Sequence, residues 1–206
     1  MTRRMRAAAC AGALAGAWML AGAGVVVYGR QPGQPAVAAL PAAPAAKAGP
    51  AALQKTSVEG VRSFTRVDAT VACAGATSSA ALAELRRQGF AAVVNLRLAS
   101  EPTADVYASM EAASRAGLRY LHLPFDSGKP DPGVVERFLA AVADRANQPM
   151  LIHCGSGGRA GAMWFVKRVV VDRWPDDQAM AEAEAIGLGN AALKTWITEY
   201  VRTRGK

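Results

Sequence analysis

Cysteine and histidine are scarce in this sequence, and their scarcity argues against two classes of protein. The 206 residues contain three cysteines, Cys10, Cys73 and Cys154, and two histidines, His122 and His153. No C-x-x-C pair is present, so the sequence predicts neither a disulfide scaffold nor a metal site built from cysteine and histidine. We accordingly expect no metal and no cofactor.

Aromatic residues make up only 6% of the chain, and no stripe of basic side chains with interleaved aromatics is found. The formal net charge is +8, but the first 49 residues hold five basic and no acidic side chains. The remaining charge is modest and needs no polyanionic partner to explain it. We therefore predict that the protein does not bind nucleic acid.

The N-terminus predicts a membrane-targeting segment over residues 1–28. Three arginines lie among the first six residues, and Ala7 to Tyr28 then runs 22 residues without a charge. A helix of that length spans about 33 Å, enough to cross a hydrocarbon core. The arginines before it favour a cytoplasmic N-terminus, with the rest of the chain on the periplasmic side of the inner membrane.

A cleaved signal peptide is the alternative interpretation of the same segment. Ala21-Gly22-Ala23 and Ala36-Val37-Ala38 both fit a cleavage site of small residues, which would release the domain into the periplasm. Residues 29–57 follow, with five prolines among many alanines, and this composition is typical of an extended linker. The folded domain is therefore expected at residues 58–206.

Within this domain, strand-like and helix-like segments alternate. Short apolar runs at 91–96, 120–123 and 150–153 predict strands, and helices are expected near 78–87, from Thr103 to Gly117, around 134–142, and over 159–172, 177–186 and 190–204. Thr103 and Asp176 are the expected N-caps of two of these helices. The pattern predicts an α/β fold of three layers, with a mostly parallel central sheet flanked by helices.

The segment His153-Cys154-Gly155-Ser156-Gly157-Gly158-Arg159 carries most of the chemical information. A strand ends at a cysteine, three of the next four residues are glycine, and an arginine opens a helix. Glycines let consecutive backbone N–H groups turn toward a bound anion, and a helix N-terminus adds positive potential. We predict Cys154 as a nucleophile, Arg159 as a bidentate oxyanion ligand, and residues 155–158 as the anion-binding loop, oriented by His153.

This segment resembles the signature loop of dual-specificity-type protein tyrosine phosphatases. Further segments are similar to compact bacterial members of that superfamily: Phe64-Thr65-Arg66-Val67, Ala74-Gly75-Ala76, Gly89 to Arg97 with Glu101, and Tyr120-Leu121-His122-Leu123-Pro124. The likeness runs from about Ser63 to Leu188. It implies a phosphatase-like fold and hydrolysis of phosphate monoesters, from a small molecule or a protein, through a phospho-cysteine intermediate.

The loop departs from the usual phosphatase signature in two respects. Four residues rather than five separate Cys154 from Arg159, and Ala160 replaces the hydroxyl residue that typically follows the arginine. A four-residue spacing resembles that of single-domain rhodaneses, and also that of a subset of compact bacterial phosphatase-like domains. Two alternatives therefore stay open: a sulfurtransferase that carries a persulfide on Cys154, and a domain that binds a phosphorylated ligand without catalysis.

The resemblance also implies an aspartate that protonates the leaving group, on a loop upstream of the cysteine. Asp126 follows a predicted strand end and is the preferred candidate. Asp131 is the alternative, although its position before Pro132 also suits a helix start. For Arg97 two interpretations remain: a second contact to the anion, or an ion pair with Glu101. The sequence indicates no particular substrate and no oligomeric state.

Overall fold

Six short strands and six α-helices build the part of the chain that the structure, a computed structural model, describes, residues 52–204. The strands are β1 (Gln54–Lys55), β2 (Thr65–Arg66), β3 (Val71–Ala74), β4 (Ala92–Asn95), β5 (Arg119–His122) and β6 (Met150–His153). The helices are α1 (Leu82–Arg87), α2 (Val106–Ala116), α3 (Pro132–Ala143), α4 (Gly158–Val170), α5 (Asp176–Ile186) and α6 (Ala191–Arg204). Two 3-10 turns, Ser79–Ala81 and Arg145–Asn147, complete the order.

The strands form one sheet in the order β1-β2-β3-β6-β4-β5. The neighbouring strands β3, β6, β4 and β5 run parallel to one another. At the other edge of the sheet, β1 pairs antiparallel with β2, and β2 pairs antiparallel with β3. The expected mostly parallel sheet is therefore confirmed, and β6 occupies its centre.

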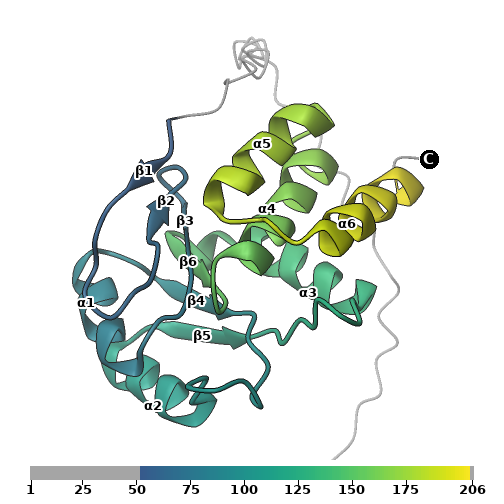
Figure 1. The fold of residues 1–206 in the computed structure, drawn as a ribbon. Coiled ribbons are helices and arrows are strands. Elements are labelled where there is room, and N and C mark those ends of the chain that lie inside the picture. Colours follow the sequence, from purple (N-terminus) through teal and green to yellow (C-terminus); the bar gives the residue numbers. More distant parts are fainter. Residues whose placement is uncertain (1–51, 205–206) are drawn as a thin grey trace, which may run out of the picture. The chain divides into compact units, whose positions relative to one another are not determined.

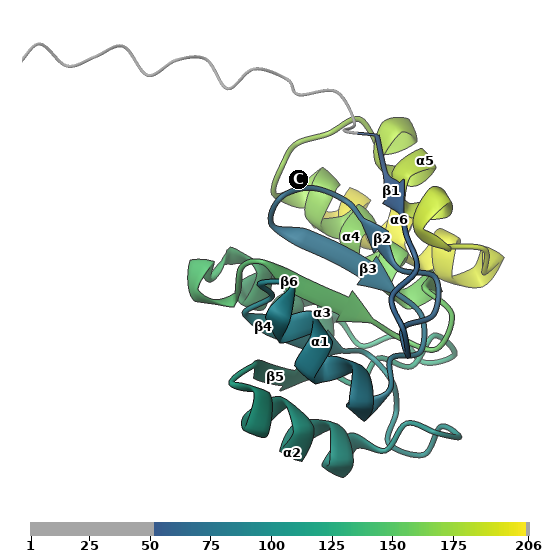
Figure 2. The ribbon, with the colours of Figure 1, turned by 90° about the vertical axis from the view of Figure 1, so that its left-hand side faces the viewer.

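Helices cover both faces of this sheet, as Figures 1 and 2 show, so the expected three-layer arrangement is confirmed. Successive strand residues point to opposite faces. In β4, for instance, Val93 packs in the cluster that includes α1 and α2, whereas Ala92 and Val94 pack in the cluster formed with α3, α4, α5 and α6. Because both of their faces are covered, the inner strands β3, β4 and β6 are fully buried and mainly apolar rather than alternating, whereas the parallel edge strand β5 is only partly buried and carries polar side chains.

Helix α4 is the most buried of the four helices, α3 to α6, that cover this second face of the sheet. Its side chains Met163, Trp164, Phe165 and Val166 are each no more than 1% exposed, in line with a segment that is apolar nearly all round. The helix follows directly on β6, the central strand. The loop between them therefore lies at the carboxyl edge of the parallel strands, where open α/β sheets bind ligands.

The sheet begins before the expected domain start at Val58. Strand β1 lies at Gln54–Lys55, within the range expected as linker, and Thr56 N–H donates to the Phe64 carbonyl at 3.2 Å. Two exposed polar residues carry no hydrophobic pattern, so only their pairing with β2 reveals this strand.

Two expected helix caps are wrong. Helix α2 is capped by Asp105, whose carboxylate accepts from Ala108 N–H at 3.1 Å, and Thr103 lies two residues further upstream. Asp176 is the first residue of α5 and Pro175 its N-cap, so the Asp176 carboxylate contributes only its charge near the helix N-terminus. The other expected boundaries hold to within a few residues; Gly117, for example, ends α2 in the left-handed conformation.

The predicted membrane segment, Ala7–Tyr28, and most of the predicted linker lie outside the described residues. Within residues 52–204, no helix combines the length and the apolar character that a membrane span requires.

Candidate active site

The loop after β6 brings the Cys154 thiol under the N-terminus of α4. Cys154 is 1% exposed, and its sulfur accepts a hydrogen bond of 3.1 Å from the Gly157 N–H. Gly157 has a φ of +99°, a conformation that side-chain-bearing residues rarely adopt, so a glycine is needed to aim this N–H at the sulfur.

Backbone donors without acceptors follow Cys154 along the chain. Within residues 52–204 no acceptor is found for five N–H groups of the loop and the first helical turn, those of Gly155, Ser156, Gly158, Arg159 and Ala160. The helix N-terminus adds its partial positive charge to these donors. Such a concentration of unused donors is typical of an anion-binding nest, and residues 155–158 stay the predicted anion-binding loop.

The nest is supported from behind by the end of α5. A methyl group on Gly157 would lie 3.0 Å from the Ile186 carbonyl oxygen, and one on Gly158 would lie 3.2 Å from that of Gly187. On the next helical turn, a methyl group on Gly161 would lie only 2.5 Å from the Ala183 carbonyl oxygen. Glycines therefore allow the loop and α4 to approach α5 this closely, which fixes the nest in shape.

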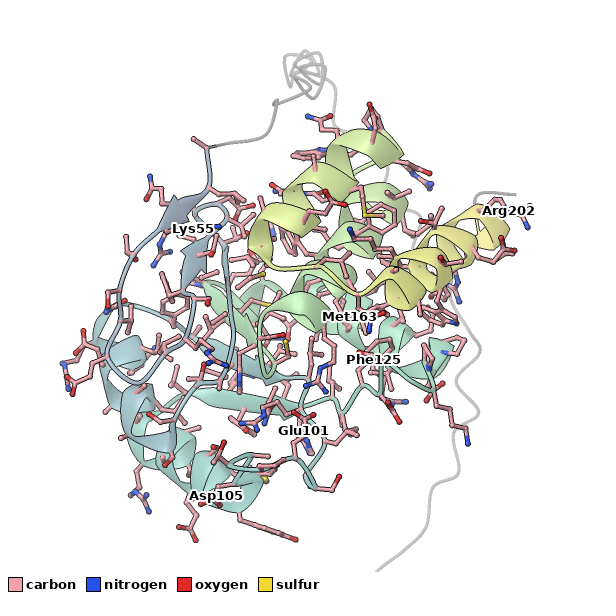
Figure 3. The ribbon with its side chains drawn as sticks, viewed as in Figure 1. Lys55, Glu101, Asp105, Phe125, Met163 and Arg202 are labelled. Carbon is pink, nitrogen blue, oxygen red and sulfur yellow. The ribbon has the colours of Figure 1, made fainter. Side chains whose placement is uncertain are left out.

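Arg159 extends over the nest and is held by a carboxylate from a distant segment. Its Nη1 and Nη2 donate to the two oxygens of Glu101 at 2.6 and 2.9 Å, and Nη1 also reaches the carbonyls of Leu96 and Phe125. Figure 3 labels Glu101 and Phe125, which come from the loops that follow β4 and β5. Burial alone would lower the pKa of Arg159, but the Glu101 hydrogen bonds and the nearby Cys154 sulfur raise it, so the group stays charged.

The contact with Glu101 uses one edge of the Arg159 guanidinium and leaves the other edge unused. No acceptor for Nε is found within residues 52–204, and Nη2 has one N–H to spare. An arginine presents its donors as a planar fork, so the Nε and Nη2 edge can still grip two oxygens of a tetrahedral anion. Arg159 can thus bind the anion without giving up Glu101.

Glu101 is the site residue that the sequence reasoning missed, since the sequence paired it only with Arg97. Burial would raise its pKa, but the hydrogen bonds from Arg159 and from Leu98 N–H prevail and lower the pKa to about 2. Its place four residues after Arg97, in a segment similar to that of the phosphatases, was the only signal. Its 58-residue separation from Arg159 hid the contact.

The two acid candidates lie in different surroundings, although the Asp126 carboxylate also accepts a backbone N–H two residues further on, from Gly128 at 2.8 Å. Asp131 is the N-cap of α3, where its carboxylate accepts from Gly133 N–H at 2.8 Å. Asp126 is exposed and follows Phe125, whose carbonyl contacts Arg159. Its neighbour Ser127 lines a depression of about 380 Å³ beside the nest, together with Ser156, Gly158, Arg159, Gly187, Gly189, Asn190 and Leu193. Asp126 therefore lies at the rim of the site.

Two buried groups flank the nucleophile. His153 is 3% exposed, its Nδ1 has no partner within residues 52–204, and burial together with the positive charge of Arg97 lowers its pKa to about 4. Cys73, on β3, is fully buried, and burial and the neighbouring Cys154 raise the pKa of its thiol. Both groups are therefore uncharged at neutral pH. Residues 52–204 contain no cluster of three or more metal-ligating side chains.

Comparisons with known proteins agree with this arrangement. The family described as "Beta-lactamase hydrolase-like protein, phosphatase-like domain" matches residues 60–171. A curated relative, the beta-lactamase hydrolase-like protein of Xylella fastidiosa (strain Temecula1), is 27% identical over 135 residues, or 64% of this chain and 31% of the relative. The chain thus spans about a third of the length of this relative.

Solved structures share the fold at low sequence identity. A putative phosphatase (DUF442) from Shewanella putrefaciens is 23% identical with a TM-score of 0.60, over 71% of this chain and 95% of that one. TpbA of P. aeruginosa, a Cys-to-Ser variant in complex with pTyr, is 22% identical with a TM-score of 0.56, over 73% and 88%. The core catalytic domain of the S. cerevisiae PP-IP phosphatase SIW14 is 17% identical with a TM-score of 0.58, over 72% and 94%.

The family match covers more than half of the chain and includes β3 to α4, with the cysteine loop and Arg159. The chain therefore belongs to the family of phosphatase-like domains of beta-lactamase hydrolase-like proteins, and its fold is shared with solved phosphatase structures.

Proposed function

We propose that the protein is a cysteine-dependent phosphatase that hydrolyses phosphate monoesters. The observation that carries the proposal is the set of five unused N–H donors in the loop and helical turn that follow a buried thiol, together with the free edge of Arg159. These donors match the equatorial oxygens of a phosphoryl group, on which negative charge is spread in the transition state.

The proposed reaction has two steps. The Cys154 thiolate attacks phosphorus as the bond to the ester oxygen breaks, and the Asp126 carboxyl gives its proton to that oxygen. A water molecule then attacks the phospho-cysteine and passes its proton to Asp126. Inorganic phosphate leaves, and the thiolate is regenerated.

The names of the similar proteins support this function, since the matching family is described as phosphatase-like and a structural neighbour, SIW14, as a PP-IP phosphatase. A neighbour holds pTyr, which is a phosphate monoester. The proposed substrate is therefore a phosphate monoester of a protein or a small molecule. The depression beside Arg159 is lined by small and polar residues together with Leu193, and none of them is aromatic. It thus offers no ring that would select a tyrosyl group over a smaller alcohol.

One feature favours a second candidate, sulfur transfer. Only four residues separate Cys154 from Arg159, and the sulfur accepts from a single N–H. In this reaction the thiolate takes the outer sulfur of thiosulfate, sulfite leaves, and the persulfide on Cys154 then gives that sulfur to a nucleophile such as cyanide. No acid is needed, so Asp126 would have no role.

Assays of phosphate release and of sulfur transfer on the same purified chain distinguish the two candidate functions. We expect release of phosphate from an aryl phosphate, inhibited by vanadate, and no transfer of sulfur from thiosulfate to cyanide. Cys154→Ser abolishes turnover, because a serine hydroxyl is far less ionised than a thiol. Asp126→Asn lowers the rate by roughly 10²–10⁴, the range for general acid catalysis, whereas Asp131→Asn, which retains the helix cap, does not.

Sulfur transfer without phosphate release would replace the first function by the second. Binding of phosphate with neither activity would instead assign the domain to recognition of a phosphorylated ligand. Equal losses in the two aspartate variants would contradict the choice of Asp126.

A further inference from the structure

A second arginine, Arg97, contacts the same carboxylate that holds Arg159. Its Nε donates to Glu101 Oε2 at 3.2 Å, its Nη1 donates to the Thr103 carbonyl at 2.9 Å, and its Nη2 donates to the Pro102 carbonyl. The side chain is 6% exposed. All three guanidinium nitrogens are engaged, so Arg97 is not a second contact for the substrate anion.

The segment that Arg97 holds adopts a backbone that is unfavourable by itself. Thr103 and Asp105 have φ angles of +59° and +24°, a region that residues other than glycine rarely occupy. Residues in such conformations persist only where the surrounding structure over-determines them. Two of the donors of Arg97 end on this segment, at Pro102 and Thr103, so its guanidinium holds the loop from Leu98 to Asp105 in this shape.

Arg97 is itself anchored to the sheet. Its N–H donates to the buried Asn95 side chain at 2.8 Å, and its carbonyl oxygen lies 2.9 Å from His122 Nε2. Asn95 and His122 are the last residues of β4 and β5. The arginine therefore joins the rigid carboxyl edge of the sheet to the loop that carries Glu101.

The Glu101 carboxylate accepts two hydrogen bonds on each oxygen. Oε1 takes Arg159 Nη1 and Leu98 N–H, at 2.6 and 2.8 Å, while Oε2 takes Arg159 Nη2 and Arg97 Nε, at 2.9 and 3.2 Å. With four donors in place the carboxylate has a single orientation. That orientation determines which edge of Arg159 is turned away from it and toward the nest.

We propose that Arg97 is a positioning residue, which acts through Glu101 to orient Arg159 for the phosphoryl group before substrate binds. The inference rests on the anion-binding role proposed for Arg159. It extends that role to a residue that contacts neither the substrate nor Arg159 directly.

Binding of inorganic phosphate to the full chain tests this without requiring turnover. The variants are Arg97→Lys, Glu101→Gln and the double variant, with titration calorimetry as the readout per folded molecule. Lysine keeps the charge but cannot serve Glu101, Pro102 and Thr103 together. Arg168→Lys is the matched control, because Arg168 is also buried and paired with a glutamate, Glu182, but has no contact with Glu101.

We expect Arg97→Lys to weaken phosphate binding roughly 10- to 100-fold, the range for losing a hydrogen bond between charged groups. The double variant should bind no more weakly than Glu101→Gln alone, since both changes break one chain of contacts. Arg168→Lys should bind phosphate as the unchanged protein does. Arg97→Lys with unchanged affinity, or additive losses in the double variant, would overturn the inference.

The same titrations separate this inference from the proposed function. If the unchanged protein binds phosphate but hydrolyses no ester, and Arg97→Lys still weakens binding, the inference holds and the phosphatase function fails. If the unchanged protein binds no phosphate, both fail.

A measurement on the unchanged protein covers the case in which Arg97→Lys does not fold. In ¹⁵N relaxation spectra of arginine side chains, Arg159 Nε should be as rigid as Arg168 Nε before any ligand is added, and its signal should shift when phosphate binds. A mobile Arg159 Nε in the free protein would contradict pre-orientation through Glu101.

Discussion

The two ends of helix α4 each carry an arginine paired with a glutamate, partly buried at Arg159 and buried at Arg168, yet the two arginines differ in which of their donors are left unused. At the N-terminal end, Arg159 uses one edge for Glu101 and keeps the other free. At the C-terminal end, Arg168 donates through Nε and Nη2 to Glu182 and through Nη1 to Asp172, and its Nη2 lies 3.6 Å from Asp68.

The faces of the two guanidinium groups differ as well. The Arg168 Cζ lies 4.7 Å and 4.2 Å from the ring centroids of Trp164 and Trp174, and Trp164 also donates to Glu182. All three guanidinium nitrogens of Arg168 are engaged by carboxylates, so this cation, unlike Arg159, presents no free pair of donors to a ligand. An ion pair alone therefore does not indicate a function; the unused donors around it do.

The largest expected effect separates the two arginines directly. Arg159→Lys should lower the turnover number by ~10²–10³, the range for losing an oxyanion contact, with little change in stability. Arg168→Met should leave turnover per folded molecule unchanged but cost about 3–5 kcal/mol of unfolding free energy, since Glu182 is left buried without its main partner. Phosphate release and urea denaturation on the same samples measure both. Loss of turnover in fully folded Arg168→Met would contradict the contrast between a ligand-binding Arg159 and a structural Arg168.

The second largest expected effect is a dependence of stability on pH. His153, which lies near the N-terminal end of α4, is buried without a compensating carboxylate. Its pKa falls from 6.5 in the unfolded chain to about 4, so the unfolded state binds more protons between these values. The contribution of His153 to stability is therefore complete above pH 6.5 and is lost as the pH falls to about 4. A shift of this size corresponds to about 3 kcal/mol.

Urea titrations between pH 7 and 4 test this, with His153→Gln as the variant that lacks the dependence. Glu101 acts in a lower window, because its pKa falls from 4.5 to about 2. Its contribution is complete above pH 4.5 and is lost as the pH falls from there toward 2. An unchanged pH dependence in His153→Gln would show that another group titrates in the upper window.

The smallest expected effect lies between the two ends, where α4 contacts α5. Gly161→Ala places a methyl group 2.5 Å from the backbone oxygen of Ala183, so one of the helices must shift. We expect a loss of about 1–3 kcal/mol, as for overpacking elsewhere, visible in urea denaturation. Gly189→Ala is the control, since its methyl group meets nothing within 4 Å. Equal stability of both variants would show that the helices separate at no cost.

Local sequence was sufficient for features that depend on neighbouring residues. The strand before Cys154, the glycine loop and the helix from Gly158 all follow from a short segment, because glycine conformations and helix termini are local properties. Where two local signals competed, the prediction failed. Thr103 and Asp105 are both able to cap a helix, and only the backbone path showed that Asp105 does so.

The sequence by itself determined the nucleophile candidate Cys154, the arginine candidate Arg159 and the three-layer α/β class. Only the tertiary structure decided that Glu101 contacts Arg159 and that Arg97 supports Glu101. The reason is the strand order, which places β4 beside β6 although α2, β5 and α3 separate them along the chain. Contacts between the loops after two such strands depend on register and on side-chain direction. A single sequence shows neither of these before the chain is folded.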